Sequence, residues 1–120
     1  RRDLAAIGFN HQGLLRFGNY LRRSGRAEAG RRYYQAGLTI ASHMLAEPYL
    51  SVDPKHQGLI LHSVYHRPNG WDFVPPGQKV PCGESSMWGD YHARELALML
   101  LREAKGLPGY HFFLNPPTQG

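Results

Sequence analysis

The sequence has one cysteine, three lysines and no long apolar run. The first and the last of these exclude an intrachain disulfide and a transmembrane helix. Cys82 stands alone, so no intrachain disulfide can form, and we expect a packed or merely tolerated thiol. No stretch of about 18 apolar residues is present, so no transmembrane helix is predicted. No signal peptide is visible, and the chain runs from Arg1 directly into a helical pattern. From this we expect a fragment or processed chain of a cytoplasmic protein.

The positive charge is carried mainly by arginines in the first third of the chain. The net charge is +5, and eight of the fourteen basic residues are Arg1, Arg2, Arg16, Arg22, Arg23, Arg26, Arg31 and Arg32. One interpretation is a surface for nucleic acid or another polyanion. The other is the solvated outer face of a helix pair, which is the usual fate of charged residues. No nucleic-acid motif accompanies the arginines, so we favour the second interpretation and predict no nucleic-acid partner.

Apolar periodicity predicts a helix hairpin over residues 4–46. Leucine, isoleucine and phenylalanine recur at helical spacing over 4–23, and a second stripe runs over 27–46. The short break at 24–30 makes the two helices antiparallel neighbours, and Pro48 ends the second one. Gly8, Gly13 and Gly18 weaken the first helix, and we expect them to mark close approach to neighbouring helices.

The rest of the chain is predicted to be a loop with a small β-hairpin, a final helix and a tail. Residues 49–83 form the loop region, with a strand over 58–66, a turn at 67–71 and a returning strand over 71–74. The final helix covers 86–104, with Ser85 or Ser86 as N-cap and Gly106 as the glycine that closes it. Residues 105–120 are the tail.

The apolar character of the final helix indicates that it packs against helices beyond those of this chain. Its LALMLL run, residues 96–101, is apolar all round, which implies burial on more than one side. Three helices and a small hairpin barely supply enough partners for that. We therefore expect these elements to complete a larger helical array, such as a solenoid or a closed α/α barrel.

Two segments carry a family resemblance. HQGLILHSVYHRP (56–68) and GESSMWGDYHARELAL (83–98) resemble the last third of the unsaturated glucuronyl hydrolases, glycoside hydrolase family 88. The preceding hairpin looks like the penultimate helix pair of that family, so the resemblance spans roughly residues 3–113. The matching residues are Gly58, Leu59, Leu61, His62, Glu84, Ser85, Trp88, Gly89, Asp90, Tyr91, Glu95, Leu96 and Ala97.

The resemblance implies an all-α fold with a small β-hairpin, in which residues 1–120 form the C-terminal portion of one (α/α)6-barrel domain. It implies a hydrolase of unsaturated uronyl oligosaccharides left by polysaccharide lyases. An aspartic acid protonates the C4=C5 double bond, water adds at C5, and the hemiketal opens to release the sugar. No metal or organic cofactor takes part. The implied partners are the substrate oligosaccharide and the rest of the barrel, with no membrane; the oligomeric state is left open.

The implied catalytic aspartates belong to a part of the family that this chain does not match. None of Asp3, Asp53, Asp72 and Asp90 fits that motif, so we assign no catalytic residue and expect the chain alone to be inactive. Asp90, in the first turn of the final helix, is better interpreted as a capping or dipole-stabilising carboxylate. Glu95, five residues later, points elsewhere on a helix and receives no catalytic role.

Seven residues are candidates for substrate binding: His62, Trp71, Lys79, Ser85, Ser86, Trp88 and Tyr91. His62 is expected to donate or accept a hydrogen bond at the barrel mouth, and Trp71 to be a rim aromatic. Trp88 and Tyr91 either form a wall of the sugar site or pack in the core. Lys79, with the serines, either holds a carboxylate or sulfate or is simply solvated. His62 and His66 alone do not make a metal site, since zinc needs three or four ligands.

Competing hypotheses remain open at this point. A relative of the unsaturated rhamnogalacturonyl hydrolases shares the implied fold and chemistry. A non-enzymatic helical scaffold would use the aromatic loop for a protein partner and would show recurring helix-pair units. A basic nucleic-acid binder would show steep salt dependence.

Overall fold

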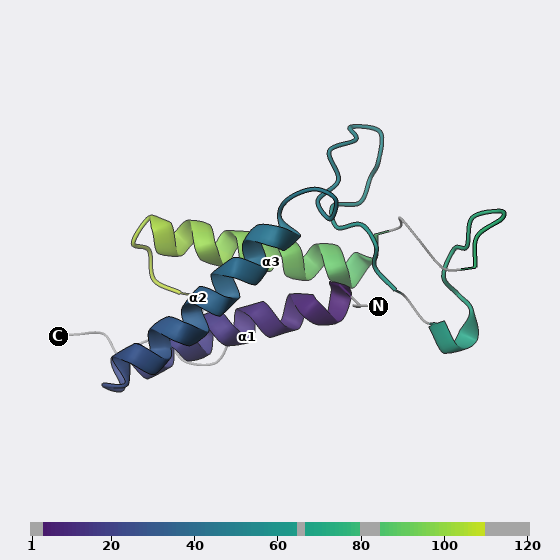
Figure 1. Ribbon diagram of the computed structural model, residues 1–120. Helices are drawn as coiled ribbons and strands as arrows, with labels where there is room; N and C mark the ends of the chain where they lie inside the picture. Colours follow the sequence, from purple (N-terminus) through teal and green to yellow (C-terminus); the bar gives the residue numbers. More distant parts are fainter. Residues whose placement is uncertain (1–3, 65–66, 80–84, 110–120) are drawn as a thin grey trace.

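The computed structural model describes residues 4–64, 67–79 and 85–109 and is helical. Its elements are α1 (Leu4–Arg23), α2 (Ala27–Met44), the short 3-10 helix η1 (Arg67–Asn69) and α3 (Met87–Ala104) (Figure 1). The three long helices confirm the predicted all-α class. Helix α2 ends two residues before the predicted boundary at 46, within the usual spread of helix ends. No helix in the described ranges has the length and apolar character needed to cross a membrane.

Helices α1 and α2 form the predicted antiparallel hairpin. Gly25, at φ +83°, closes the turn, and the Arg26 amide donates to the Leu21 carbonyl at 2.9 Å. Gly18 lies where the two backbones nearly touch: a Cβ there would stand 2.7 Å from the Tyr34 nitrogen. The expectation of close approach is confirmed for Gly18, whereas the corresponding space around Gly13 is open.

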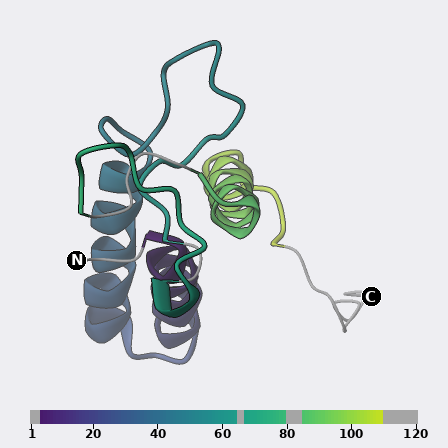
Figure 2. The ribbon, with the colours of Figure 1, turned by 90° about the vertical axis from the view of Figure 1, so that its right-hand side faces the viewer.

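The core lies between the three helices and the loop that follows α2. Helix α3 packs against α1, and Figure 2 shows it nearly end-on beside the hairpin. Ile60, from the loop, is 1% exposed and closes the core from that side. The cluster of buried side chains is Leu15, Ala41, Met44, Ile60, Ala93 and Leu96.

The ends of α3 are capped as predicted. The Ser86 hydroxyl accepts a hydrogen bond from the Gly89 amide at 3.2 Å, which makes Ser86 the N-cap. At the other end Gly106 has φ +64°, and its amide donates to Glu103 while the Leu107 amide donates to Arg102. This pair of bonds is a Schellman motif, so the helix start and stop both follow from local sequence.

The predicted β-hairpin is not present in the described parts of residues 58–74. Ile60 makes only an isolated antiparallel bridge to Leu50. The Leu61 amide donates to Tyr49 at 2.7 Å, so this segment pairs with the end of the α2 loop and not with residues 71–74. The strand expectation was wrong there because other acceptors take the amides of this segment. Residues 65–66, including His66, lie outside the described residues, as do Cys82 and the tail after Gly109.

One side of α3 stays open. Leu96 is fully buried, but Leu98 and Leu101 are 42% and 50% exposed, and Met87 and Tyr91 are exposed as well. These four positions are spaced by four, seven and three residues, so they share one face of the helix. The described residues therefore cover α3 on one side, and the burial expected on the other side is not provided by them.

Candidate functional site

The start of α3 is tied to the loop 58–63 by the Asp90 carboxylate. Its Oδ2 accepts a hydrogen bond from the Leu59 amide, and its Oδ1 accepts one from the Ile60 amide, each at 2.9 Å. Asp90 lies in the first helical turn, as predicted, where a negative charge also suits the helix dipole. Bonds to an ionised acceptor are stronger than neutral ones, so this carboxylate fixes the loop against the helix. We call this junction the Asp90 clamp.

Small residues let the two segments of the Asp90 clamp come together. A side chain on Gly58 would collide with Ser85. A Cβ on Gly89 would lie 2.9 Å from the Ser86 hydroxyl and 3.0 Å from that of Ser63. Both glycines are thus required for close packing, not for unusual backbone angles. Within the described residues, the two segments that carry the resemblance, 56–64 and 85–98, pack against each other as one structural unit.

Five of the seven predicted binding residues belong to this unit. Ser86 is buried and its hydroxyl caps the helix, while Ser85 is half-buried against Gly58. Trp88 is half-buried. Tyr91 is 58% exposed, and its ring meets His92 edge-on at 5.1 Å. Of the four predicted binding residues at the start of α3, Tyr91 is therefore the exposed one.

His62 is exposed and lies just beyond the Asp90 clamp. Its φ is +62°, in the left-handed region that few side chains adopt, and its ring meets Tyr49 edge-on at 6.2 Å. Such a backbone conformation persists only where the surroundings hold it. The two residues before His62 are held by hydrogen bonds, from the Ile60 amide to Asp90 and from the Leu61 amide to Tyr49, and these fix the backbone from which the imidazole emerges.

Trp71 and Lys79 belong to a separate loop, residues 67–79, which projects from the helices (Figure 1). Trp71 is 60% exposed and Lys79 is exposed. The structure thus brings together five of the predicted residues and leaves two on a neighbouring loop. None of the seven lines the groove between α1 and α3.

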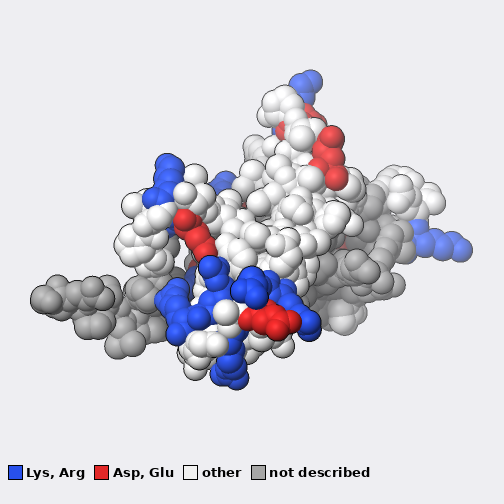
Figure 3. Space-filling model, turned by 60° about the vertical axis from the view of Figure 1, so that its left-hand side comes forward, with Lys and Arg blue, Asp and Glu red and all other residues white. Residues whose placement is uncertain are grey.

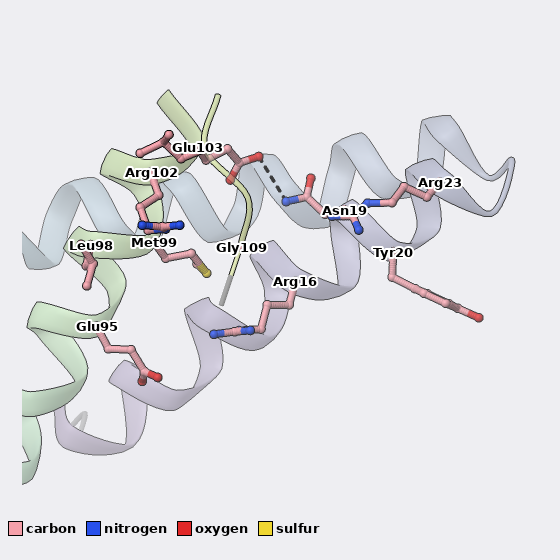
Figure 4. A pocket seen from close by; sticks show the side chains of 11 residues that line it. Arg16, Asn19, Tyr20, Arg23, Glu95, Leu98, Met99, Arg102, Glu103 and Gly109 are labelled. Carbon is pink, nitrogen blue, oxygen red and sulfur yellow. Dashed lines mark hydrogen bonds between the residues drawn. The ribbon is translucent and has the colours of Figure 1, made fainter. Parts of the chain in front are cut away.

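That groove has a volume of about 390 Å³ and was not predicted from sequence (Figure 4). It carries charges of both signs. The Asn19 amide donates to Glu103 at 3.2 Å, and Arg102 donates twice to the Pro108 carbonyl at 3.0 and 2.8 Å. The lining residues are Arg16, Asn19, Tyr20, Arg23, Glu95, Leu98, Met99, Arg102, Glu103, Leu107 and Gly109.

A buried polar contact joins α1 to α3 beneath the groove. Gln12 is 8% exposed, and its side-chain amide donates to the Glu95 carboxylate at 2.8 Å and to the His92 carbonyl at 3.2 Å. His92 Nδ1 lies 3.5 Å from the same carboxylate. Glu95 therefore holds the two helices together. Sequence reasoning missed Gln12 because a glutamine on a helix gives no sign of its partner.

One tyrosine of α2, Tyr34, has a raised pKa. Burial raises the pKa of Tyr34 above its ordinary value of 10.0, the Glu103 carboxylate raises it further, and Arg22 opposes the rise. The Arg22 guanidinium lies 5.7 Å from the centre of the Tyr34 ring. Tyr34 is thus held neutral and packed, which is a structural role.

The described residues contain no group of three or more histidine, cysteine, aspartate or glutamate side chains placed to hold a metal ion. The carboxylates of Asp90 and Glu95 are engaged separately, one with loop amides and one with Gln12. No convergent acid pair therefore forms at the start of α3.

Comparisons with known proteins found no matching family model, no matching curated protein and no matching solved structure.

Proposed function

We propose that this chain is the C-terminal portion of an (α/α)6-barrel hydrolase of the unsaturated glucuronyl hydrolase type. The observation that carries the proposal is the Asp90 clamp. It joins the two segments of the resemblance, residues 58–62 and 85–91, through two hydrogen bonds of 2.9 Å. The open face of α3 adds support, because a barrel would cover it with neighbouring helices.

In this proposal each candidate residue has a role in binding an unsaturated uronyl oligosaccharide. Tyr91 offers an exposed ring for the apolar face of a sugar, and the half-buried Trp88 stands three residues before it on the helix. His62 offers a hydrogen bond from the adjacent loop. Ser85 and Ser86 hold the helix start in place, and Trp71 and Lys79 contribute from the rim, where the ammonium suits a carboxylate or sulfate.

The proton donor in this proposal comes from outside the described residues. Asp90 is occupied by two amides, so it serves as a structural anchor and not as the acid that protonates C4=C5. The reaction proposed is general acid catalysis of water addition, with no metal or organic cofactor, in a cytoplasmic enzyme. The remaining barrel helices supply the acid, and the chain alone does not turn over.

The test is an assay of the protein made from its complete reading frame. Disaccharides generated by a glucuronan-type lyase and by a rhamnogalacturonan lyase are supplied separately, and loss of the ultraviolet absorbance of the C4=C5 bond is followed. Turnover of either supports the proposal, and the better substrate separates the two related hydrolase types. No turnover of either rejects it.

Variants connect that activity to the residues. Tyr91→Ala and His62→Ala should each raise KM by about tenfold, which is the loss of roughly 1.4 kcal/mol of binding. His43→Ala, at an exposed position away from the Asp90 clamp, is the matched control and should leave KM unchanged.

A non-enzymatic helical interaction domain is the second candidate, favoured by the exposed apolar face of α3. It predicts a complete reading frame built of recurring helix pairs, and no turnover. The same assay therefore separates the two.

A further inference from the structure

The excess positive charge of the chain lies in one short segment. Residues 16–32 hold six arginines and one glutamate, while the rest of the sequence holds eight basic and eight acidic residues. The net charge of +5 is therefore that of this segment alone. We call the six side chains the arginine surface: Arg16, Arg22, Arg23, Arg26, Arg31 and Arg32.

The fold gathers these arginines around the hairpin turn. The last turns of α1 and the first turns of α2 meet at Gly25, and all six arginines are exposed. Figure 3 shows basic side chains clustered at this end of the molecule. The turn lies at the opposite end of the hairpin from the start of α3, so the arginine surface is separate from the Asp90 clamp (Figure 1).

Most of this charge is not neutralised. Arg32 pairs with Glu28 at 3.2 Å, and Arg22 donates to Asn19 and lies over the Tyr34 ring. The other four arginines form no ion pair with any residue in the described ranges. Several unpaired guanidinium groups on one convex end produce a positive potential that attracts anions.

The surface also carries exposed rings and a depression. Tyr20, Phe17 and Tyr33 are 60%, 45% and 43% exposed, and the Phe17 and Tyr20 rings stack at 6.4 Å. A depression of about 600 Å³ runs beside α2, lined partly by Arg22, Arg31 and Arg32. Tyr20 lines the groove between α1 and α3 together with Arg16 and Arg23, and a flat ring beside planar guanidinium groups suits a ligand that alternates sugar faces with anionic groups.

Companion helices cannot cover this end without cost, since desolvating unpaired guanidinium groups is expensive. We propose that the arginine surface binds an anionic polysaccharide, through bidentate contacts of the guanidinium groups with its carboxylate or sulfate groups. The choice of a polysaccharide over other polyanions rests on the proposed function. The surface would hold the polymer whose lyase products the enzyme consumes, as an anchoring site away from the substrate-binding residues.

The experiment measures binding and needs no turnover. The complete protein is titrated with an unsulfated polyuronate, a sulfated uronate-containing polysaccharide and a single-stranded RNA of equal charge, at low and at physiological salt. Arg26→Glu/Arg31→Glu is compared with Lys55→Glu/Lys105→Glu, which makes the same charge change at exposed positions outside the surface. Circular dichroism of both variants checks that the helices are retained.

We expect binding of at least one polysaccharide that is stronger than that of RNA and weakens with salt. The Arg26/Arg31 variant should lose about tenfold or more in affinity, and the lysine variant much less. Equal losses in both variants, tighter binding of RNA, or no polysaccharide binding would each overturn the proposal. If the wild-type protein binds but shows no turnover, the proposed hydrolase function fails and the binding surface stands.

Discussion

The Asp90 carboxylate and the Ile60 backbone amide lie thirty residues apart in sequence and 2.9 Å apart in the structure. With the second bond to Leu59, this contact fixes the loop after α2 on the first turn of α3. The loop in turn places Ile60 in the core and His62 at the surface. One carboxylate thus connects core packing to the placement of a candidate binding residue.

Replacing Asp90 with asparagine should destabilise the fold by about 1–3 kcal/mol, because an amide has one acceptor oxygen and leaves one loop N–H without its partner. Urea denaturation of the purified chain measures this. Asp53→Asn is the control: Asp53 is exposed and accepts one local bond from the Lys55 amide, which asparagine can also accept. Equal stability of the Asp90→Asn variant and the parent would contradict the role of the clamp.

Two glycines in α1 should respond in opposite directions to alanine. Gly18→Ala should cost about 1–3 kcal/mol, since its new methyl group meets the backbone of α2 at 2.7–2.8 Å. Gly13→Ala should stabilise the chain by about 0.5–1 kcal/mol, because the space around Gly13 is open and alanine is the better helix former. Thermal unfolding of the pair compares them directly. A Gly18→Ala variant that is as stable as the parent, or more stable, would mean that α1 and α2 do not meet at Gly18.

Ionisation of the Tyr34 hydroxyl should lower the stability of the fold at alkaline pH. Its folded-state pKa is raised above 10.0, mainly by burial, so its contribution is fully present below pH 10.0. The contribution is lost as pH rises from there through the raised folded-state pKa. The melting temperature of Tyr34→Phe should therefore fall less steeply than that of the parent over this range. Identical alkaline slopes would show that Tyr34 ionises equally in both states.

Local sequence patterns predicted the helices well. The spacing of apolar residues predicted the three helices. Ser86 and Gly106 predicted where α3 begins and ends, because capping depends on residues only a few positions apart. The β-hairpin was predicted wrongly because the deciding contacts are distant in sequence. The alternating residues of 58–64 look like a strand, but Asp90 takes two of their amides, and no local pattern reveals a partner thirty residues away.

Contacts between residues distant in sequence also decide the candidate site, and local patterns do not reveal them. The glycines of α1 were recognisable as unusual, but only the packing separates Gly18, against α2, from Gly13, in open space. Gln12 and the groove between α1 and α3 depend on how the helices dock, which composition does not specify. Residues of the WGDY segment were placed together because they are adjacent in sequence, whereas Trp71 and Lys79 belong to a separate loop.

We propose that the outer face of α3 packs against helices outside these 120 residues. A cysteine placed at Ala97, in a Cys82→Ser background, tests it by the rate of thiol labelling in this chain and in the protein from the complete reading frame. Arg26→Cys at the hairpin turn is the control that stays exposed in both. We expect the cysteine at position 97 to be labelled fast in this chain and to be strongly protected from labelling in the complete protein. Equally fast labelling in both, or a complete reading frame that adds no helices, would contradict it.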